Sequence, residues 1–259
     1  LTISDRIASR SNTAKLAVAG LIGGLFLLTG CGEDKGGNGA APANGQALAA
    51  AQSASVWSEN ITATADGGYL IGNPNAKVKL VEFASLTCSH CAEFAEKAVP
   101  ILKAKYIENG SVSLEIRNFL RTPYDAPAAL LSQCNGPKAF PKLFDGLMSY
   151  QPQLFAMSEK NLTPAAQAKL QALPPGQQFV ELAKLTGMVD FVAKRGIVPA
   201  KATACIANEA ALNKLLEVRK VAIEQYNLQG TPMFLINGKA VKGVSNWEGL
   251  EPQLQAALN

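Results

Sequence analysis

An apolar strand that runs directly into a Cys-x-x-Cys motif constrains this chain more than any other stretch. Residues 78–91 read VKLVEFASLTCSHC, and Cys88 and Cys91 lie close enough along the chain to form a disulfide. A helix that begins at Cys88 directs free backbone N–H groups and the positive end of its dipole at that thiol. The thiolate is stabilised there, so its pKa falls from about 8.5 into the range of about 3.5–7.5. The stretch therefore predicts a redox dithiol.

The residues around the motif predict half of a βαβ unit. Residues 78–84 form a nearly continuous apolar run, which is typical of a strand buried on both faces. Residues 88–108 predict one amphipathic helix, with Ile101 among its inward side chains and a kink at Pro100. A second strand is expected over 112–120. Strand, helix and strand in this order favour a right-handed crossover.

The region 123–226 changes character and reads as helical almost throughout. Its prolines divide it into four candidate helices, over residues 125–134, 137–148, 177–194 and 201–226. This pattern predicts a helical subdomain inserted into an α/β fold. The region also holds a second pair of cysteines, Cys134 and Cys205.

The C-terminal residues are expected to complete the sheet. Gly230-Thr231-Pro232 precedes a strand over 233–236, and Asn237-Gly238 predicts a tight hairpin to a partner strand over 240–244. A helix over 247–258 follows. Together these elements predict a mixed sheet with helices on both faces.

The N-terminal region predicts export. Residues 1–30 contain basic residues followed by the apolar run 16–28, which is short for a transmembrane span. They end at Leu28-Thr29-Gly30-Cys31, which resembles the lipobox of bacterial lipoproteins, where the signal is cut before a cysteine that then carries a diacylglycerol. The alternative is an uncleaved anchor helix with an incidental Cys31. Both interpretations place the following residues outside the cytoplasm.

Composition supports this division of the chain. Residues 31–56 are rich in Gly, Ala and Asn and lack an apolar period, so they predict a flexible tether before a domain over 57–259. After Cys31, four of the five cysteines remain for an oxidising compartment, where disulfides persist. The net charge of +4 is scattered, with no basic stripe, so nucleic-acid binding is not indicated.

At this point the residues resemble a known family. The Val81-Glu82-Phe83 stretch, the CSHC motif at 88–91, the helical insertion and Gly230-Thr231-Pro232 before FLING are similar to the DsbA-like thiol:disulfide oxidoreductases of the thioredoxin fold. The resemblance covers about residues 57–259. It implies an α/β, thioredoxin-like fold with an inserted helical subdomain over about 123–226.

The resemblance also implies roles for single residues. Cys88 would be the exposed nucleophile, Cys91 the buried resolving thiol, and His90 a source of positive charge near the thiolate. Thr231 would present its backbone to the substrate, and Pro232 would be cis and lie against the disulfide. Glu82 would match the buried acid that assists proton transfer at Cys91.

Simpler interpretations exist for the same residues. Cys88 and Cys91 could be half of a zinc site, although zinc needs four ligands and the other thiols lie in the insertion. His90 could be a solvated imidazole and Pro232 an ordinary trans proline. By strand alternation alone, Glu82 is equally well explained as an outward-facing, solvated side chain.

Cys134 and Cys205 predict a structural disulfide, because no feature that stabilises a thiolate surrounds either cysteine. The alternative is a second redox pair that tunes the first. No cofactor and no metal is expected.

The sequence thus favours a thiol:disulfide oxidoreductase, most simply one that oxidises cysteine pairs of exported proteins through a mixed disulfide with Cys88. A disulfide isomerase or reductase of the same fold is an alternative, because Ser89 stands where the best-known oxidase has Pro and Thr231 precedes Pro232. A copper-binding metallochaperone is a further one. The expected partners are unfolded or partly folded exported proteins and a membrane redox partner that resets the dithiol. The expected location is the cell envelope, by lipid anchor and facing the periplasm or extracytoplasmic side.

Overall fold

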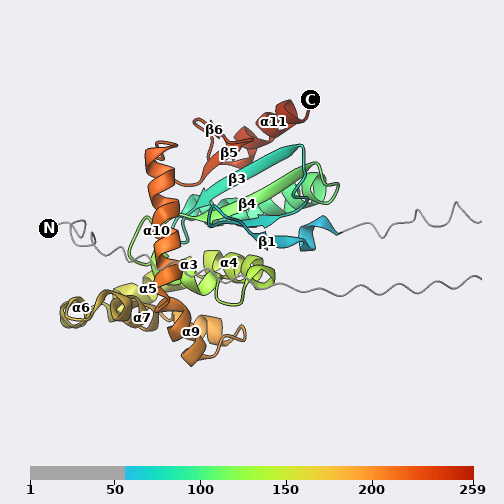
Figure 1. Cartoon of the computed structure of the whole chain (residues 1–259). Helices are drawn as coiled ribbons and strands as arrows, with labels where there is room; N and C mark the ends of the chain where they lie inside the picture. The colour runs from blue at the N-terminus through green and yellow to red at the C-terminus, as the bar shows by residue number, and fades with distance from the viewer. Residues whose placement is uncertain (1–55) are drawn as a thin grey trace, which may run out of the picture. The chain divides into compact units, whose positions relative to one another are not determined.

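A six-stranded mixed sheet organises the part of the chain that the computed structural model describes, residues 56–259 (Figure 1). The strand order is β1-β2-β4-β3-β5-β6, and only the β3–β4 pair is parallel. The strands are β1 (Ile61–Ala63), β2 (Tyr69–Ile71), β3 (Val78–Ala84), β4 (Val112–Asn118), β5 (Met233–Ile236) and β6 (Lys239–Val241). The expected mixed sheet is confirmed, with the strand that precedes the C-x-x-C at its centre.

The register of the sheet brings two distant sequence motifs together. Val78 of β3 is paired with Val112 of β4, while Phe83 of β3 is opposite Met233 of β5. The start of β5 therefore lies beside the end of β3. The Thr231–Pro232 peptide and the C-x-x-C, which flank these strand ends, are brought to the same edge of the sheet.

Strand alternation divides the side chains of β3 between two covered faces. Leu80 and Ala84 pack into the larger core, with residues of the C-x-x-C helix and of α11 (Trp247–Leu258). Val81 and Phe83 pack on the other face against α10 (Glu209–Glu224). Apart from Lys79 near its start, which is exposed, every residue of β3 is buried, so the charged side chain of Glu82 in its second half lies out of solvent.

The expected helix over 88–108 consists of α- and π-helical segments in succession. Its amide N–H at Val99 donates to the carbonyl of Phe94, five residues back, just before Pro100. Pro100 has no N–H to donate and disturbs the regular ladder. The prediction that Ile101 faces inward is wrong, since it is 36% exposed. The segments are α1 (Ser89–Glu93), η2 (Phe94–Ala98), α2 (Val99–Leu102) and η3 (Lys103–Ile107).

The helical insertion is present but is divided more finely than its sequence suggests. The single helix expected over 177–194 is broken at Gly187, which has a φ of +72°. The one expected over 201–226 is broken before Asn208, whose side chain accepts a hydrogen bond from the Ala211 N–H. The helices are α3 (Asp125–Ser132), α4 (Phe140–Ser149), α5 (Gln151–Asn161), α6 (Pro164–Gln171), α7 (Pro175–Leu185), α8 (Met188–Ala193), α9 (Pro199–Ile206) and α10. Two of them, α5 and α6, were not predicted.

Two short 3-10 turns and the C-terminal elements complete the described chain. The turns are η1 (Trp57–Glu59) and η4 (Pro137–Ala139). Positive φ values at Asn237 and Gly238 fit the hairpin turn predicted there. The hairpin and α11 are confirmed, although β6 covers Lys239–Val241 rather than 240–244, and β4 ends at Asn118 rather than at residue 120.

Three predictions fall outside the described residues. They are the signal over 1–30, the lipidation site Cys31 and the tether over 31–56 apart from its last residue. Among residues 56–259, no helix is both long and apolar enough to cross a membrane.

Candidate redox site

The Cys88 thiol lies at the start of the C-x-x-C helix, where several donors meet it. Cys88 is the N-cap of α1, with extended backbone angles, and its carbonyl already accepts from Ala92 at 3.0 Å. The Cys91 thiol is the strongest stabiliser of the Cys88 thiolate, and the backbone N–H groups of Cys91 and His90 add to it. Against the opposing effect of burial, these donors lower the pKa of Cys88 to about 5. The site therefore holds a thiolate at neutral pH.

Cys88 is less accessible than expected. The expectation of an exposed nucleophile is wrong for this conformation, because Cys88 is only 4% exposed, while Ser89 and His90 are exposed. The Thr231–Pro232 loop covers this thiol. The Sγ of Cys88 donates to the Thr231 carbonyl at 3.1 Å.

The Thr231–Pro232 peptide bond is cis and lies over the dithiol. Besides the carbonyl contact, Thr231 has a buried hydroxyl that makes no hydrogen bond of regular geometry within residues 56–259, but it lies near enough to the Cys88 sulfur to donate to the thiolate. This hydroxyl also lowers the pKa of Cys88. Thr231 thus offers an acceptor to the protonated thiol and a donor to the thiolate.

Cys91 has the opposite environment, although it is only three residues from Cys88. Cys91 is fully buried, and this burial raises the pKa of its thiol far above the ordinary range. Hydrogen bonding to Cys88 and the charge of Glu82 act in the same direction. One thiol of the pair is therefore ionised at neutral pH and the other is protonated.

Glu82 lies beneath this pair on the central strand. It is 1% exposed, which overturns the solvated alternative. Its Oε1 has no hydrogen-bond partner among residues 56–259. Burial raises the pKa of Glu82 to about 8, and the charges of Asp145 and Cys88 contribute in the same direction. A carboxyl group with such a pKa is able to exchange a proton near neutral pH.

The second pair of cysteines lies apart from this site. Cys134 and Cys205 are joined by a disulfide across 71 residues of sequence, with a Cα–Cα distance of 5.6 Å, and link the end of α3 to α9. Within residues 56–259, no group of three or more His, Cys, Asp or Glu side chains is placed to hold a metal ion.

Asp125 is a buried residue near the site, and the sequence predicts it only as the start of a helix. Its carboxylate accepts from the hydroxyls of Ser85 (2.9 Å), Thr87 (3.0 Å) and Thr122 (3.1 Å). It also accepts from the backbone N–H groups of Arg121 at 3.0 Å and Thr122 at 2.7 Å. It therefore ties the loop before the C-x-x-C to the start of the insertion. The only sequence signal was an acidic residue in a first helical turn.

Gln151, the first residue of α5, was also missed. It is 5% exposed, and its Nε2 donates to the Cys88 carbonyl at 3.1 Å. The insertion thus holds the backbone of the first cysteine directly. Its only sequence signal was the adjacent Pro152, since proline is favoured in a first helical turn.

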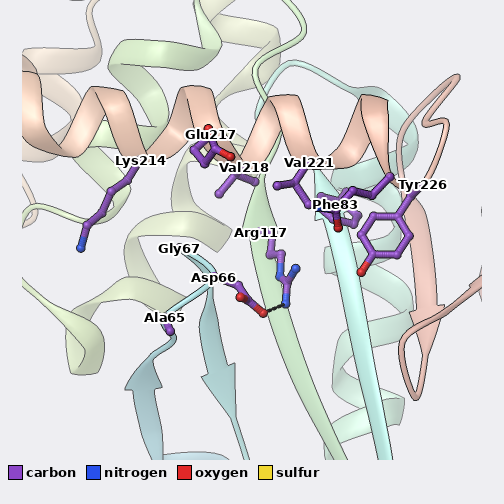
Figure 2. Close-up of a pocket in the computed structure, with 11 residues that line it drawn as sticks. Ala65, Asp66, Gly67, Phe83, Arg117, Lys214, Glu217, Val218, Val221 and Tyr226 are labelled. Carbon is purple, nitrogen blue, oxygen red and sulfur yellow. Dashed lines mark hydrogen bonds and ion pairs between the residues drawn. The ribbon is translucent and has the colours of Figure 1, made fainter.

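A separate cavity of about 340 Å³ lies between α10 and the sheet, on the Phe83 side (Figure 2). Its central cation, Arg117, is paired with Asp66 at 2.6 Å and with Glu115 at 2.8 Å. None of the site residues predicted from sequence lines this cavity. The positive charge of Arg117 is already paired with these two carboxylates, and no cysteine lines the cavity. The cavity therefore lacks the redox chemistry of the dithiol site.

Comparisons with known proteins agree with this geometry. The family model described as thioredoxin matches residues 64–256. A crystal structure described as a protein-disulfide isomerase from Novosphingobium aromaticivorans is 37% identical, with a TM-score of 0.71 over 76% of this chain and 100% of that one. The structure of Wolbachia pipientis α-DsbA1, at 20% identity and a TM-score of 0.57 over 74% and 90% of the two chains, supports the fold.

Curated relatives from Rickettsia carry names that describe candidate protein-disulfide oxidoreductases. The Rickettsia bellii protein is 25% identical over 68% of this chain, and the Rickettsia prowazekii protein is 27% identical over 70% of it. The matched regions span 59% and 58% of those two relatives, so the likeness covers little more than half of their length.

Proposed function

The chain belongs to the thioredoxin family, and from that premise we propose that it is a thiol:disulfide oxidoreductase that oxidises cysteine pairs of exported proteins. The observation that carries the proposal is the Cys88 thiol, held at a helix start with a pKa of about 5, against the carbonyl of Thr231. A structural thiol has no need of such stabilisation.

The proposed reaction starts from the Cys88–Cys91 disulfide. A client thiolate attacks the sulfur of Cys88, the bond to Cys91 breaks, and Cys91 takes up a proton as it leaves. A second client thiolate then attacks the client sulfur of the mixed disulfide and releases Cys88 as a thiolate. The client loses two electrons and gains a disulfide, and the Cys88–Cys91 pair is reduced to one thiolate and one thiol.

The residues around the pair have distinct proposed roles in these steps. Glu82 would deliver the proton to Cys91, because it is buried near that thiol and its pKa of about 8 keeps it largely protonated at neutral pH. Thr231 and Pro232 would hold the client backbone beside Cys88. His90 would act through its backbone N–H, which reaches the thiolate, while its imidazole is exposed.

The low pKa of Cys88 favours the oxidising direction. Lowering a thiol pKa from 9.0 to about 5 stabilises the reduced protein. At pH 7 only the interval between pH 7 and the Cys88 pKa of about 5 contributes to this stabilisation, which is about 2 pKa units or about 3 kcal/mol. For a two-electron couple this energy corresponds to about 60 mV toward a stronger oxidant.

A disulfide isomerase is the second candidate, because the 37% identical chain from Novosphingobium is described as one. An isomerase needs the same thiolate, but it acts from the reduced state on a wrongly paired client disulfide. The two functions therefore differ in the state of Cys88–Cys91 that reacts.

Redox titration of the purified domain against glutathione tests the direction. We expect a potential above the −270 mV of thioredoxin by about the 60 mV that the thiolate contributes, in the direction of the −120 mV of a strong oxidant. The oxidised domain should oxidise a reduced dithiol peptide. Cys91→Ser mixed with oxidised glutathione should accumulate a mixed disulfide at Cys88, because Cys88 displaces one glutathione thiolate and the resolving thiol is absent. If Cys88→Ser oxidised the peptide at the normal rate, the assignment would be wrong. Activity only from the reduced state, on scrambled disulfides, would favour the isomerase.

We further propose that the domain works in the cell envelope, outside the cytoplasm. The disulfide between Cys134 and Cys205 supports an oxidising compartment, and the lipobox-like residues before Cys31 support a lipid anchor. A membrane redox partner would then reset the Cys88–Cys91 pair. Incorporation of labelled fatty acid that is lost in Cys31→Ser tests the anchor, and a soluble, unlabelled native protein would contradict it.

A further inference from the structure

A groove lies between the C-x-x-C helix and the helical insertion, and it is distinct from the Thr231–Pro232 loop. It encloses about 670 Å³ between α1 and η2 on one side and α4 and α5 on the other. We call it the insertion groove. Its walls include Ser89, Glu96, Asp145, Met148, Gln151 and Phe155.

The insertion groove adjoins the reacting cysteine. Ser89, the residue directly after Cys88, forms part of its wall. Gln151 in the opposite wall donates to the Cys88 carbonyl at 3.1 Å and to the Met148 sulfur at 3.4 Å. A polypeptide whose cysteine reaches Cys88 therefore has its neighbouring residues within reach of this groove.

The groove presents apolar surface to solvent. Phe155 is 44% exposed, although its ring is held edge-on against Tyr124. Met148 is buried beneath the groove, and Ala92 and Ala95 of the facing helix are half-buried in its wall. An exposed aromatic side chain over an apolar floor is typical of a surface that binds a partner's side chain.

The groove also carries more negative than positive charge, because Glu93, Glu96 and Asp145 line it and Lys97 is the one cation among the lining residues. Glu93 is paired with Lys97 at 2.8 Å. By contrast, no ion pair to Glu96 or Asp145 is formed within residues 56–259. Burial raises the pKa of Asp145, and the charge of Lys103 offsets this only in part. A cation placed in the groove would therefore be favoured.

We propose that the insertion groove binds the client segment that flanks the reacting cysteine, and that it selects an apolar side chain next to a Lys or Arg. The proposal rests on the oxidoreductase function above and deepens it. It assigns the insertion a role in substrate choice, because α4 and α5 supply one whole wall. The apolar side chain contacts Phe155 and Met148, while the cationic one is attracted by Glu96 and Asp145.

Two reduced dithiol peptides of equal length test the proposal. One carries Leu-Lys next to its first cysteine, and the other carries Leu-Glu. For the native domain we expect kcat/KM for oxidation to be about tenfold higher with the Lys peptide, which corresponds to about 1.4 kcal/mol. The ratio should fall as salt rises, because the attraction involves partly exposed charges.

Variants locate the preference. The pair Glu96→Gln with Asp145→Asn should bring the ratio close to one, and Phe155→Ala should lower kcat/KM for both peptides. Glu217→Gln and Leu216→Ala on α10 are the controls, since both residues are exposed outside the groove. They should leave both values as in the native domain. The ratio cancels any change in the thiol chemistry itself.

The outcomes separate this proposal from the proposed function. If the native domain oxidises both peptides equally well, the groove proposal fails and the oxidoreductase function stands. If it oxidises neither, the function fails. If sedimentation shows a dimer that Phe155→Ala dissociates, the groove is instead covered by a second copy, and client binding there is overturned.

Discussion

At the residue scale, Cys88 and Cys91 are the same side chain in two opposite environments. Cys88 meets helix N-terminal N–H groups and the Cys91 thiol, which lower its pKa, whereas Cys91 is enclosed by apolar side chains that raise its pKa. Because Cys91 follows Cys88 by three residues, almost one helical turn, its thiol faces the core while the Cys88 thiol stays at the helix start. The dithiol is asymmetric because of this step of the helix and not because of residue type.

The pKa of Cys88 gives a prediction about the stability of the reduced form. The pKa of Cys88 is lowered from 9.0 in the unfolded chain to about 5 in the folded one, so ionisation of this thiol stabilises the fold fully at pH values above about 9. This stabilisation is lost as pH falls from about 9 to about 5. The difference in unfolding free energy between the reduced protein and Cys88→Ser should shrink across that window. Urea titrations at several pH values measure it, and a constant difference would contradict the low pKa.

Glu82 gives the opposite pH dependence. Its pKa is raised from 4.5 to about 8, so its contribution to folding is fully present below about pH 4.5 and is lost as pH rises through about 8. Glu82→Gln should therefore match the native protein at acid pH and exceed its stability by a few kcal/mol at pH 9. The same variant should release Cys91 more slowly in stopped-flow oxidation. Equal stability at pH 9 would show that Glu82 is not held in a buried, unfavourable state.

At the scale of elements, the insertion is part of the site and not an appendage. Asp125 at the start of α3 holds the loop before Cys88, and Gln151 at the start of α5 holds the Cys88 carbonyl. Two insertion helices thus fix the backbone of the first cysteine from opposite ends of its loop.

Asp125→Ala tests this coupling. The change removes an acceptor shared by five hydrogen bonds and leaves buried hydroxyls of Ser85 and Thr87 with fewer partners. We expect a loss of about 3–5 kcal/mol in unfolding free energy, since each unsatisfied group costs about 1–3 kcal/mol. The Cys88 pKa, followed by alkylation rate against pH, should rise as its loop loosens. Asp190→Ala, at an exposed position in α8, is the control and should change neither value.

At the scale of the whole described molecule, one covalent link joins helices far apart in sequence. The Cys134–Cys205 disulfide closes 71 residues of the insertion between α3 and α9. Closing such a loop restricts the unfolded chain more than the folded one. The link therefore stabilises the insertion that holds the cysteine loop.

Replacing both cysteines with Ala should separate its two possible roles. The chain-entropy model predicts a loss of about 4 kcal/mol in unfolding free energy. If the disulfide is a structural link, the potential of the Cys88–Cys91 pair stays unchanged in the folded variant. A shift in that potential without a large loss of stability would indicate a regulatory pair instead.

The sequence alone determined the features that depend on neighbouring residues. The strand before Cys88, the Asn237-Gly238 hairpin and α11 follow from periodicity and turn residues, which act over a few positions. The order of motifs also led to the correct fold family. The single helix predicted over 177–194 is wrong, because the chain forms two helices there that are separated at Gly187. The break depends on a backbone conformation that glycine permits but does not require.

Only the tertiary structure decided the features that depend on distant residues. The burial of Cys88 depends on a loop 143 residues away, and that of Glu82 depends on which helices cover each face of β3. The hydrogen bond from Gln151 depends on where α5 packs. Burial and hydrogen bonding arise from packing between segments, and they set the pKa values of Cys88, Cys91 and Glu82. The sequence thus marks where the dithiol lies, and the packing around it sets its chemistry.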